Sequence, residues 1–150
     1  MHAQEFTPIV KQFVKKDYNA ANQNWAVGQT SDGVMYFGNN QSLLEFDGSM
    51  WKNIKLPQNK IVRSLMIDSN DRIYVGSFQE FGFFEKDAFG NLQYTSLSAE
   101  LKDYKMKNDE IWNIIELNGT VIFQSFTSYF IYDGKYTKGL RCKYTFLFFN

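Results

Sequence analysis

Short alternations of apolar and polar residues recur along the chain, each following a turn. The clearest is DRIYVGSF (71–78), which has a counterpart in GVMYFGNN (33–40) and a weaker one in GTVIFQSF (119–126). Alternation with a period of two predicts strands that bury every second side chain. The copies begin at residues 33, 71 and 119, so they are 38 and 48 residues apart. A unit of roughly 40–50 residues with four short strands is typical of a β-propeller blade.

The first unit, residues 24–60, contains four strand signals separated by turn residues. The expected strands are 24–29, 34–38, 43–46 and 50–56. Ser31-Asp32-Gly33 and Asp47-Gly48 are expected turns, because glycine adopts positive φ at no steric cost and Asp-Gly is a strong hairpin signal. Pro57 ends the last strand, since proline has no N–H to give to a strand ladder.

The second unit (61–109) and the third unit (110–138) repeat this plan. Their expected strands are 62–68, 72–78, 81–87, 92–98, 110–117, 120–126, 129–134 and a short last strand at 135–138. Asn118-Gly119 and Asp133-Gly134 fall at the turn positions of the earlier units. Residues 99–109 are polar and lysine-rich, which predicts a surface insertion with Lys102, Lys105 and Lys107 on a solvated face.

Composition supports an all-β fold and limits the possible functions. Aromatic residues make up 18% of the chain, and aromatic side chains favour strands. The 16 basic and 16 acidic residues give a net charge of zero, so no basic surplus draws the chain to nucleic acid or to an anionic membrane. A single cysteine, Cys142, excludes an internal disulfide. A single histidine, His2, excludes a multi-histidine metal site within the chain.

Three blades are too few for a closed propeller, which has roughly four to eight. An open array exposes an apolar face and an unpaired strand edge. We therefore expect the chain to be the N-terminal piece of a longer protein or a truncated gene product, and the alternative is a ring assembled from several chains. The pattern stops after Lys138, and residues 139–150 form a divergent tail whose apolar run is prone to aggregation.

Several stretches resemble a known repeat family. Residues 24–51 and 62–78 are similar to two-component regulator propeller repeats. The opening residues Pro8-Ile9, Phe13, Asp17-Tyr18 and Gln23-Asn24-Trp25, with NNQSLLEFDG, FQEFGFF and YTSLS further on, resemble the N-terminal part of Bacteroidetes periplasmic sensor regulators. In that group the propeller precedes a triple-tyrosine domain, a membrane span, a coiled coil and a LuxR-type helix-turn-helix.

The resemblance covers about residues 8–138 and implies a role in sensing. It implies a periplasmic location and a small extracellular ligand, often a glycan fragment. Residues 139–150 do not match, and this sequence contains none of the signalling elements. Any transcriptional role therefore belongs to a longer parent chain, for which the resemblance implies a homodimer. This segment is not expected to bind nucleic acid directly.

The N-terminal lead-in, residues 1–23, allows two interpretations. Ile9, Val10, Phe13 and Val14 have helical spacing, and Pro8 suits a first helical turn. The other interpretation is an extended segment with a turn at residues 17–19, and the resemblance favours it. Met1-His2-Ala3 is compatible with the end of a signal peptide, because alanine suits a cleavage site, and equally with an ordinary start. No apolar stretch is long enough to span a membrane.

Candidate ligand-binding residues lie before the inner strands and in the loops after the second strands, which open on one face of a propeller. A polar site on an apolar frame is the default binding hypothesis there, and tryptophan faces with amide, carboxylate and guanidinium groups suit a sugar. The candidates are Trp25, Asn39, Asn40, Arg63, Gln79, Glu80, Trp112 and Thr127, with Ser125 in the same loop.

Several of these candidates also have a purely structural interpretation. Tryptophan at a repeated position commonly packs between blades. Arg63 could join adjacent blades by donating to loop carbonyls, and Asn39-Asn40 could be ordinary turn residues.

Catalysis and metal binding are not expected of this chain. Paired acids occur at Glu45/Asp47 and at Asp109/Glu110, but nothing in the sequence places either pair in one cleft. Asp68, Asn70 and Asp71 lack the later glycine and glutamate of a calcium loop and are interpreted as a turn. We expect no cofactor and no metal. The alternative functions are a piece of a propeller enzyme, such as a lyase or glycan-active protein, or a truncated product without independent function.

Overall fold

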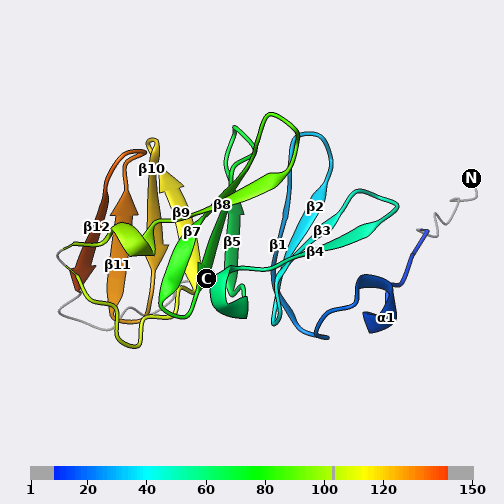
Figure 1. The fold of residues 1–150 in the computed structure, drawn as a ribbon, viewed down its shortest axis with the longest axis horizontal. Coiled ribbons are helices and arrows are strands. Elements are labelled where there is room, and N and C mark those ends of the chain that lie inside the picture. The colour runs from blue at the N-terminus through cyan, green and yellow to red at the C-terminus, as the bar shows by residue number, and fades with distance from the viewer. Residues whose placement is uncertain (1–8, 103, 142–150) are drawn as a thin grey trace, which may run out of the picture.

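The computed structural model describes residues 9–102 and 104–141, and these form three antiparallel sheets of four strands each. The sheets lie side by side along the long axis of the molecule, each built from strands consecutive in sequence (Figure 1). Blade 1 comprises β1 (Asn24–Gln29), β2 (Met35–Asn39), β3 (Leu43–Phe46) and β4 (Trp51–Ile54). Blade 2 comprises β5 (Ser64–Ile67), β6 (Ile73–Ser77), β7 (Glu80–Lys86) and β8 (Leu92–Ser96). Blade 3 comprises β9 (Asn113–Leu117), β10 (Thr120–Gln124), β11 (Ser128–Tyr132) and β12 (Thr137–Arg141).

The all-β fold with four-stranded blades predicted from the alternating pattern is confirmed. The turn glycines at 33, 48, 119 and 134 all have positive φ. One boundary differs from expectation, because β12 continues to Arg141 and pairs Ser128 with that residue, so residues 139–141 belong to blade 3 rather than to a divergent tail. Residues 142–150, with Cys142 and the apolar run, lie outside the described residues, as do residues 1–8.

The lead-in is not a helix at the position that its apolar spacing suggests. Ile9 and Val10 are fully or largely exposed, and the one helical turn, α1 (Lys15–Tyr18), follows them. Asn19 ends this turn with φ 47°, close to the turn expected at residues 17–19. The ring of Phe13 packs edge-on against Phe46 and Trp51, at centroid distances of 5.0 and 5.3 Å. Residues 9–14 are therefore not helical, and only Val14 has backbone angles that identify an extended conformation.

Two apolar layers join the three blades. The layer between blades 1 and 2 contains Tyr36, Leu43, Val62, Val75 and Phe84 among its buried residues. The layer between blades 2 and 3 is richer in aromatic rings and includes Tyr74, Phe81, Phe83, Phe123 and Phe130. Because each sheet places alternate side chains on opposite faces, β6 gives Val75 to the first layer and Tyr74 to the second. Blade 2 is buried on both faces for this reason.

Glycines in the second strands let neighbouring blades approach closely. A β-carbon built at Gly38 would lie 2.9 Å from the carbonyl oxygen of Val62. One built at Gly76 would lie 2.5 Å from Cγ2 of Ile111. Val62 and Ile111 hold the same place before the inner strands of blades 2 and 3. The repeat therefore needs a glycine at this strand position so that neighbouring blades can pack closely. This requirement is separate from the ability of glycine to form turns.

The segment after blade 2 is more than the surface insertion that its polar composition predicts. It begins with η2 (Ser98–Glu100), a single 3-10 turn, while the other short turn, η1 (Pro57–Asn59), follows β4. Leu101, Tyr104 and Met106 pack against the layer between blades 2 and 3. The ring of Tyr104 meets Phe130 edge-on at 5.1 Å. Lysines alternate with these residues along the sequence. The composition of this segment therefore indicates its solvent-exposed side more clearly than its buried side.

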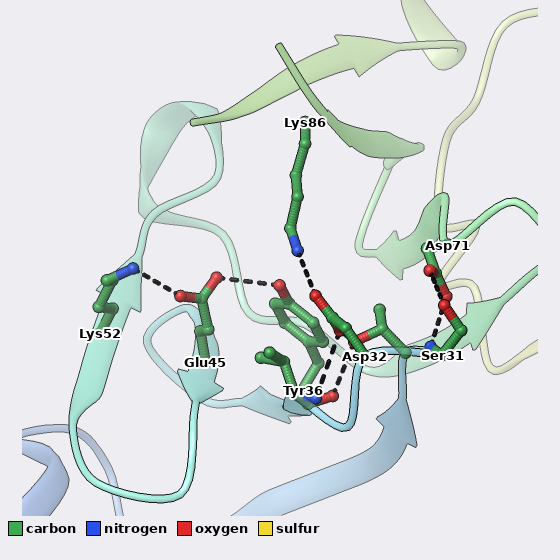
Figure 2. Close-up of polar contacts among 9 residues, drawn as sticks. Ser31, Asp32, Tyr36, Glu45, Lys52, Asp71 and Lys86 are labelled. Carbon is green, nitrogen blue, oxygen red and sulfur yellow. Dashed lines mark hydrogen bonds and ion pairs between the residues drawn. The ribbon is translucent and has the colours of Figure 1, made fainter. Parts of the chain in front are cut away.

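A polar latch joins the hairpin turns of blades 1 and 2 at the end of the molecule opposite the candidate loops. Ser31 donates its N–H and its hydroxyl to the carboxylate of Asp71, and Lys86 Nζ lies 3.0 Å from Asp32 Oδ2 (Figure 2). Nearby, Glu45 accepts from the buried Tyr36 hydroxyl at 2.9 Å and pairs with Lys52 at 2.8 Å. Burial, and then the Glu45 carboxylate, raise the pKa of the Tyr36 phenol. These carboxylates are thus engaged in holding the fold.

We expect this latch to weaken in acid. The hydrogen bond from Thr30, followed by that from Lys86, lowers the pKa of Asp32 from 3.8 to about 2. A carboxyl with a lowered folded-state pKa adds stability above its unfolded value, and that stability is lost as the pH falls through the folded value. Urea unfolding of the wild type and Asp32→Asn should differ by less than about 1 kcal/mol near neutral pH, since Asp32 is half-exposed. The gap should close between pH 4 and 2, and a constant gap would contradict the assignment.

Candidate functional site

Four of the predicted ligand-binding residues meet in one cluster, and together they come from all three blades. The guanidinium carbon of Arg63 lies 4.1 Å from the ring centroid of Trp25 and 5.5 Å from that of Trp112. The two indole rings are 6.1 Å apart and nearly perpendicular, at 76°. A cation held over two indole faces is a favourable cation–π arrangement. We call Trp25, Asn40, Arg63, Glu110 and Trp112 the arginine cluster.

Polar partners fix the arginine in this position. Arg63 Nε donates to Glu110 Oε1 at 2.5 Å, and the two side chains are 16% and 22% exposed. Asn40 Oδ1 accepts from Trp25 Nε1 at 2.6 Å and, at 3.5 Å, from Arg63 Nη1. A partly buried, charge-assisted pair is stronger than a surface ion pair. The positive charge of Arg63 is therefore largely compensated by Glu110.

The local backbone explains why these side chains converge. The N–H of Arg63 donates to Gly76 O and that of Trp112 donates to Gln124 O, so both precede their inner strands in the same register. At Trp25 the pairing of β1 with β2 is interrupted between Asn24 and Ala26. Such an irregularity turns one side chain away from the regular alternation. The repeat thus directs equivalent residues of three blades to the same point.

The remaining predicted residues lie outside the arginine cluster and have structural contacts. Asn39 is fully buried, donates from Nδ2 to Ala21 O and Asn24 Oδ1, both at 2.7 Å, and fixes the lead-in to blade 1. Gln79 donates from Nε2 to the carbonyl of Lys107. These contacts correspond to the turn interpretation for Asn39 and to a loop-fixing role for Gln79.

Glu80 is engaged within its own blade. Its Oε1 accepts from the hydroxyls of Tyr94, Ser96 and Ser98 at 2.9, 2.7 and 3.0 Å. Burial, and then the charge of Glu80, raise the pKa of the Tyr94 phenol. Thr127 is exposed in the loop between β10 and β11, where its N–H lies 3.4 Å from Ser125 Oγ. Thr127 lines a separate pocket beside the arginine cluster.

The sequence does not single out Phe126 as a site residue. Its ring is 45% exposed and lies 5.6 Å from that of Trp112. Phe126 is aligned with Asn40 in the repeat, so the loop of blade 3 has a ring where blade 1 has an acceptor. The Nε1 of Trp112 is buried and has no hydrogen-bond partner among the described residues, unlike that of Trp25. Alignment of the loops after the second strands could have identified Phe126.

The paired acids do not share a cleft. Asp47 accepts from the N–H groups of Ser49 and Met50 in its own turn, while Glu45 is bonded to Tyr36 and Lys52. Asp109 is buried and accepts from Ser125 Oγ at 2.9 Å, whereas Glu110 faces Arg63. Each carboxylate is thus engaged by its own partners.

The turn interpretation of Asp68, Asn70 and Asp71 agrees with their contacts. Asp68 Oδ1 accepts from the N–H groups of Asn70 and Arg72, at 2.9 and 3.0 Å. Within residues 9–102 and 104–141, no group of three or more metal-ligating side chains occurs. No helix in this part of the chain is long and apolar enough to cross a membrane.

Comparison with known proteins identifies the fold through structure alone. No protein-family model matches the chain, and no curated protein matches its sequence. A solved structure described as the extracellular domain of a hybrid two-component system, BT4673 from B. thetaiotaomicron, matches 87% of this chain with a TM-score of 0.65 and 19% identity. The chain has the fold of part of that extracellular domain. A second structure, described as the same domain of a one-component system, matches 86% with a TM-score of 0.64 and 19% identity.

This chain spans only 18% of the length of either solved domain. Three blades therefore correspond to a small part of a much larger extracellular structure. The resemblance to sensor-regulator propellers inferred from the sequence is confirmed at the level of the fold. At 19% identity the match identifies the architecture but carries over no ligand and no residue role.

Proposed function

We propose that this chain is a portion of the ligand-sensing propeller of a membrane-bound transcriptional regulator. It binds a small extracellular ligand, such as a glycan fragment, at the arginine cluster and performs no catalysis. The observation that carries the proposal is the convergence of Trp25, Arg63 and Trp112, one from each blade, at one point. A ligand bound there contacts all three blades at once, so it can influence how they sit together.

The chemistry of the cluster suits a sugar ring. Trp25 is 38% exposed, which leaves an indole surface for the apolar face of a pyranose. Arg63 and Asn40 retain donors beyond their mutual contacts, and the second oxygen of Glu110 is a further acceptor. Because Glu110 already compensates the arginine, the cluster favours hydroxyl groups over a net charge. A neutral part of a carbohydrate is the ligand that fits it best.

The outward face of blade 3 supports a longer parent chain. Ile115, Ile122 and Ile131 lie opposite one another on that face. In the repeat they are aligned with Met66, Tyr74 and Phe83, which blade 2 packs against blade 3. Ile115 and the nearby Leu117 are exposed in the described structure. A further blade, packed as blade 3 packs on blade 2, would cover these residues.

The parent would place this propeller in the periplasm. Its partners would be the remaining blades, the signalling domains of the same chain and a second copy of the parent as a homodimer. Fold similarity to extracellular domains supports this location. Nucleic acid would be bound by another part of the parent, because this segment has a net charge of zero.

Arg63→Gln should weaken carbohydrate binding while leaving the fold in place. The test is intrinsic tryptophan fluorescence during titration with a panel of neutral disaccharides and tetrasaccharides, because Trp25 and Trp112 lie in the site. Removing the charge-assisted contacts should weaken binding by about tenfold or more. If no member of the panel binds the wild type, the proposed function is wrong.

Arg72→Gln is the matched control. Arg72 also pairs with a glutamate, Glu85, at 2.9 Å, and also covers an aromatic ring, Phe83, at 4.4 Å. It lies beside the latch end of blade 2, so its loss should affect binding very little. The Arg72–Glu85 pair is more exposed than the Arg63–Glu110 pair, so its loss should also cost less stability. Equal loss of binding in the two variants would show that the effect is a general loss of structure.

A further inference from the structure

A second pocket adjoins the arginine cluster on the side of blade 3. It lies between the segment after blade 2, the loop joining β10 to β11 and the end of β12. Its lining includes Tyr104, Lys107, Asp109, Phe126, Thr127 and Arg141. Phe126 belongs to this pocket, and its ring centroid lies 5.6 Å from that of Trp112 in the arginine cluster. A ligand longer than one sugar ring would therefore reach from one site to the other.

The floor of this pocket is held rigidly from below. Asp109 is 3% exposed, and its carboxylate accepts from Ser125 Oγ at 2.9 Å and from the N–H of Lys107 at 3.2 Å. The carbonyl of Asp109 accepts from the N–H of Gln79 at 2.8 Å. Tyr104 and Ser128 share a hydrogen bond of 2.5 Å. Tyr104 and Asp109 are thus held in place before any ligand binds, which lowers the entropic cost of binding.

The rim of the pocket is positively charged. Lys107 and Arg141 are both exposed, and in the described part of the chain neither forms an ion pair. The guanidinium of Arg141 lies 5.8 Å from the ring centroid of Tyr104. The lining thus contains two cations and one buried carboxylate, whose oxygens already accept hydrogen bonds. The pocket therefore has a net positive charge, in contrast to the compensated arginine cluster.

We propose that this pocket binds the anionic group of an acidic sugar, a carboxylate or a sulfate ester. The inference rests on the proposed function and deepens it by naming the ligand class as an acidic oligosaccharide. The anion lies between Lys107 and Arg141, where charge-assisted hydrogen bonds are strongest. The sugar ring stacks on Phe126, and Thr127 bonds a ring hydroxyl. The adjacent neutral residue of the ligand then occupies the arginine cluster.

The test compares three probes that share a pyranose ring: glucose, glucuronate and glucose 6-sulfate. Each is titrated into the full chain at low salt, and amide chemical shifts of Asn108 and Thr127 are followed by NMR. We expect glucuronate or glucose 6-sulfate to bind about tenfold more tightly than glucose. The stronger of the two identifies the anion. Binding of that probe should weaken as salt is raised, since the contact is exposed to solvent.

Lys107→Met and Arg141→Met should each remove this advantage, so that the acidic probe binds about as weakly as glucose. Lys135→Met is the matched control, because Lys135 is an exposed lysine of blade 3 that does not line the pocket. An acidic probe that binds no more tightly than glucose, or equally well to Lys107→Met, would overturn the proposal.

The outcomes separate this inference from the proposed function. If neutral saccharides bind and Arg63→Gln weakens that binding, the sensing site stands even when the acidic probes show no advantage. If acidic probes bind with Lys107 dependence but Arg63→Gln has no effect, the pocket stands and the arginine cluster is not the ligand site. If neither neutral nor acidic saccharides bind, both proposals fall.

Discussion

Phe81→Ala should lower the free energy of unfolding by about 3–5 kcal/mol, the usual cost of removing a buried phenylalanine ring. Phe81 is completely buried, and its ring lies 4.6 Å from that of Phe123 and 4.9 Å from that of Phe130. Those two rings belong to blade 3, so the cavity would open in the layer that joins blades 2 and 3. Urea unfolding monitored by circular dichroism gives the difference directly.

Phe89→Ala is the control for this substitution. Phe89 lies in the hairpin turn that follows β7, the strand of Phe81, and its side chain is 90% exposed. Its removal should change stability by no more than about 0.5 kcal/mol. Similar unfolding midpoints for the two variants would mean that the blades are not packed through this layer.

Gly76→Ala should destabilise the same interface by about 1–3 kcal/mol, because an added methyl group overfills a packed contact. The new β-carbon would meet Ser64 Oγ and would lie 2.5 Å from Cγ2 and 2.7 Å from Cβ of Ile111. The β-carbon of Ile111 is attached to the backbone, so the blades themselves must separate. Unfolding of Gly76→Ala, Ile111→Ala and the double variant forms a cycle that measures the part of the clash due to Cγ2 of Ile111, because alanine retains the β-carbon.

In that cycle the double variant should be more stable than the sum of the two single changes predicts. Gly28→Ala is the control for glycine replacement in a strand. Its β-carbon would meet only Leu65 Cδ2 and the end of Ile67, which are flexible side-chain ends. Its cost should therefore be smaller than that of Gly76→Ala. Strict additivity in the cycle, or an equal cost at both glycines, would show that close approach at Gly76 is unimportant.

The candidate site was only partly predictable from the sequence. Trp25, Arg63 and Trp112 could be identified because the repeat aligns them before equivalent strands, and an aligned position in each blade lies at the same end of the sheet. Asn40 could be identified in the same way, from its position in the loop after the second strand. Glu80 and Asn39 satisfied the same criterion, yet their side chains bond within blade 1 or blade 2. Register fixes where a residue lies, whereas the partner of a polar side chain depends on neighbours distant in sequence.

The remaining parts of the candidate site depend on contacts between the blades. In the sequence, Glu110 stands out only as one of two adjacent acids. Its role becomes apparent in the structure, where it pairs with Arg63, which lies 47 residues earlier in the chain. Phe126 could be identified by aligning the loops after the second strands, but the pocket with Lys107 and Arg141 could not be predicted. That pocket joins a loop, a polar segment and the end of a strand from different parts of the chain. Their proximity follows from the packing of Tyr104 against Phe130.

The blades can be predicted from the amino-acid sequence, because strand alternation, turn glycines and the repeat length are local properties. Backbone sterics and the burial of every second side chain set them. Which polar groups meet depends on the packing of the blades against one another. Packing brings Glu110 next to Arg63 and buries Asp109 below the positively charged rim. It also packs Tyr104 against the apolar layer between blades 2 and 3, although the composition of its segment indicates a solvated surface. These outcomes depend on distances between residues far apart in the chain, which packing sets and local pattern does not.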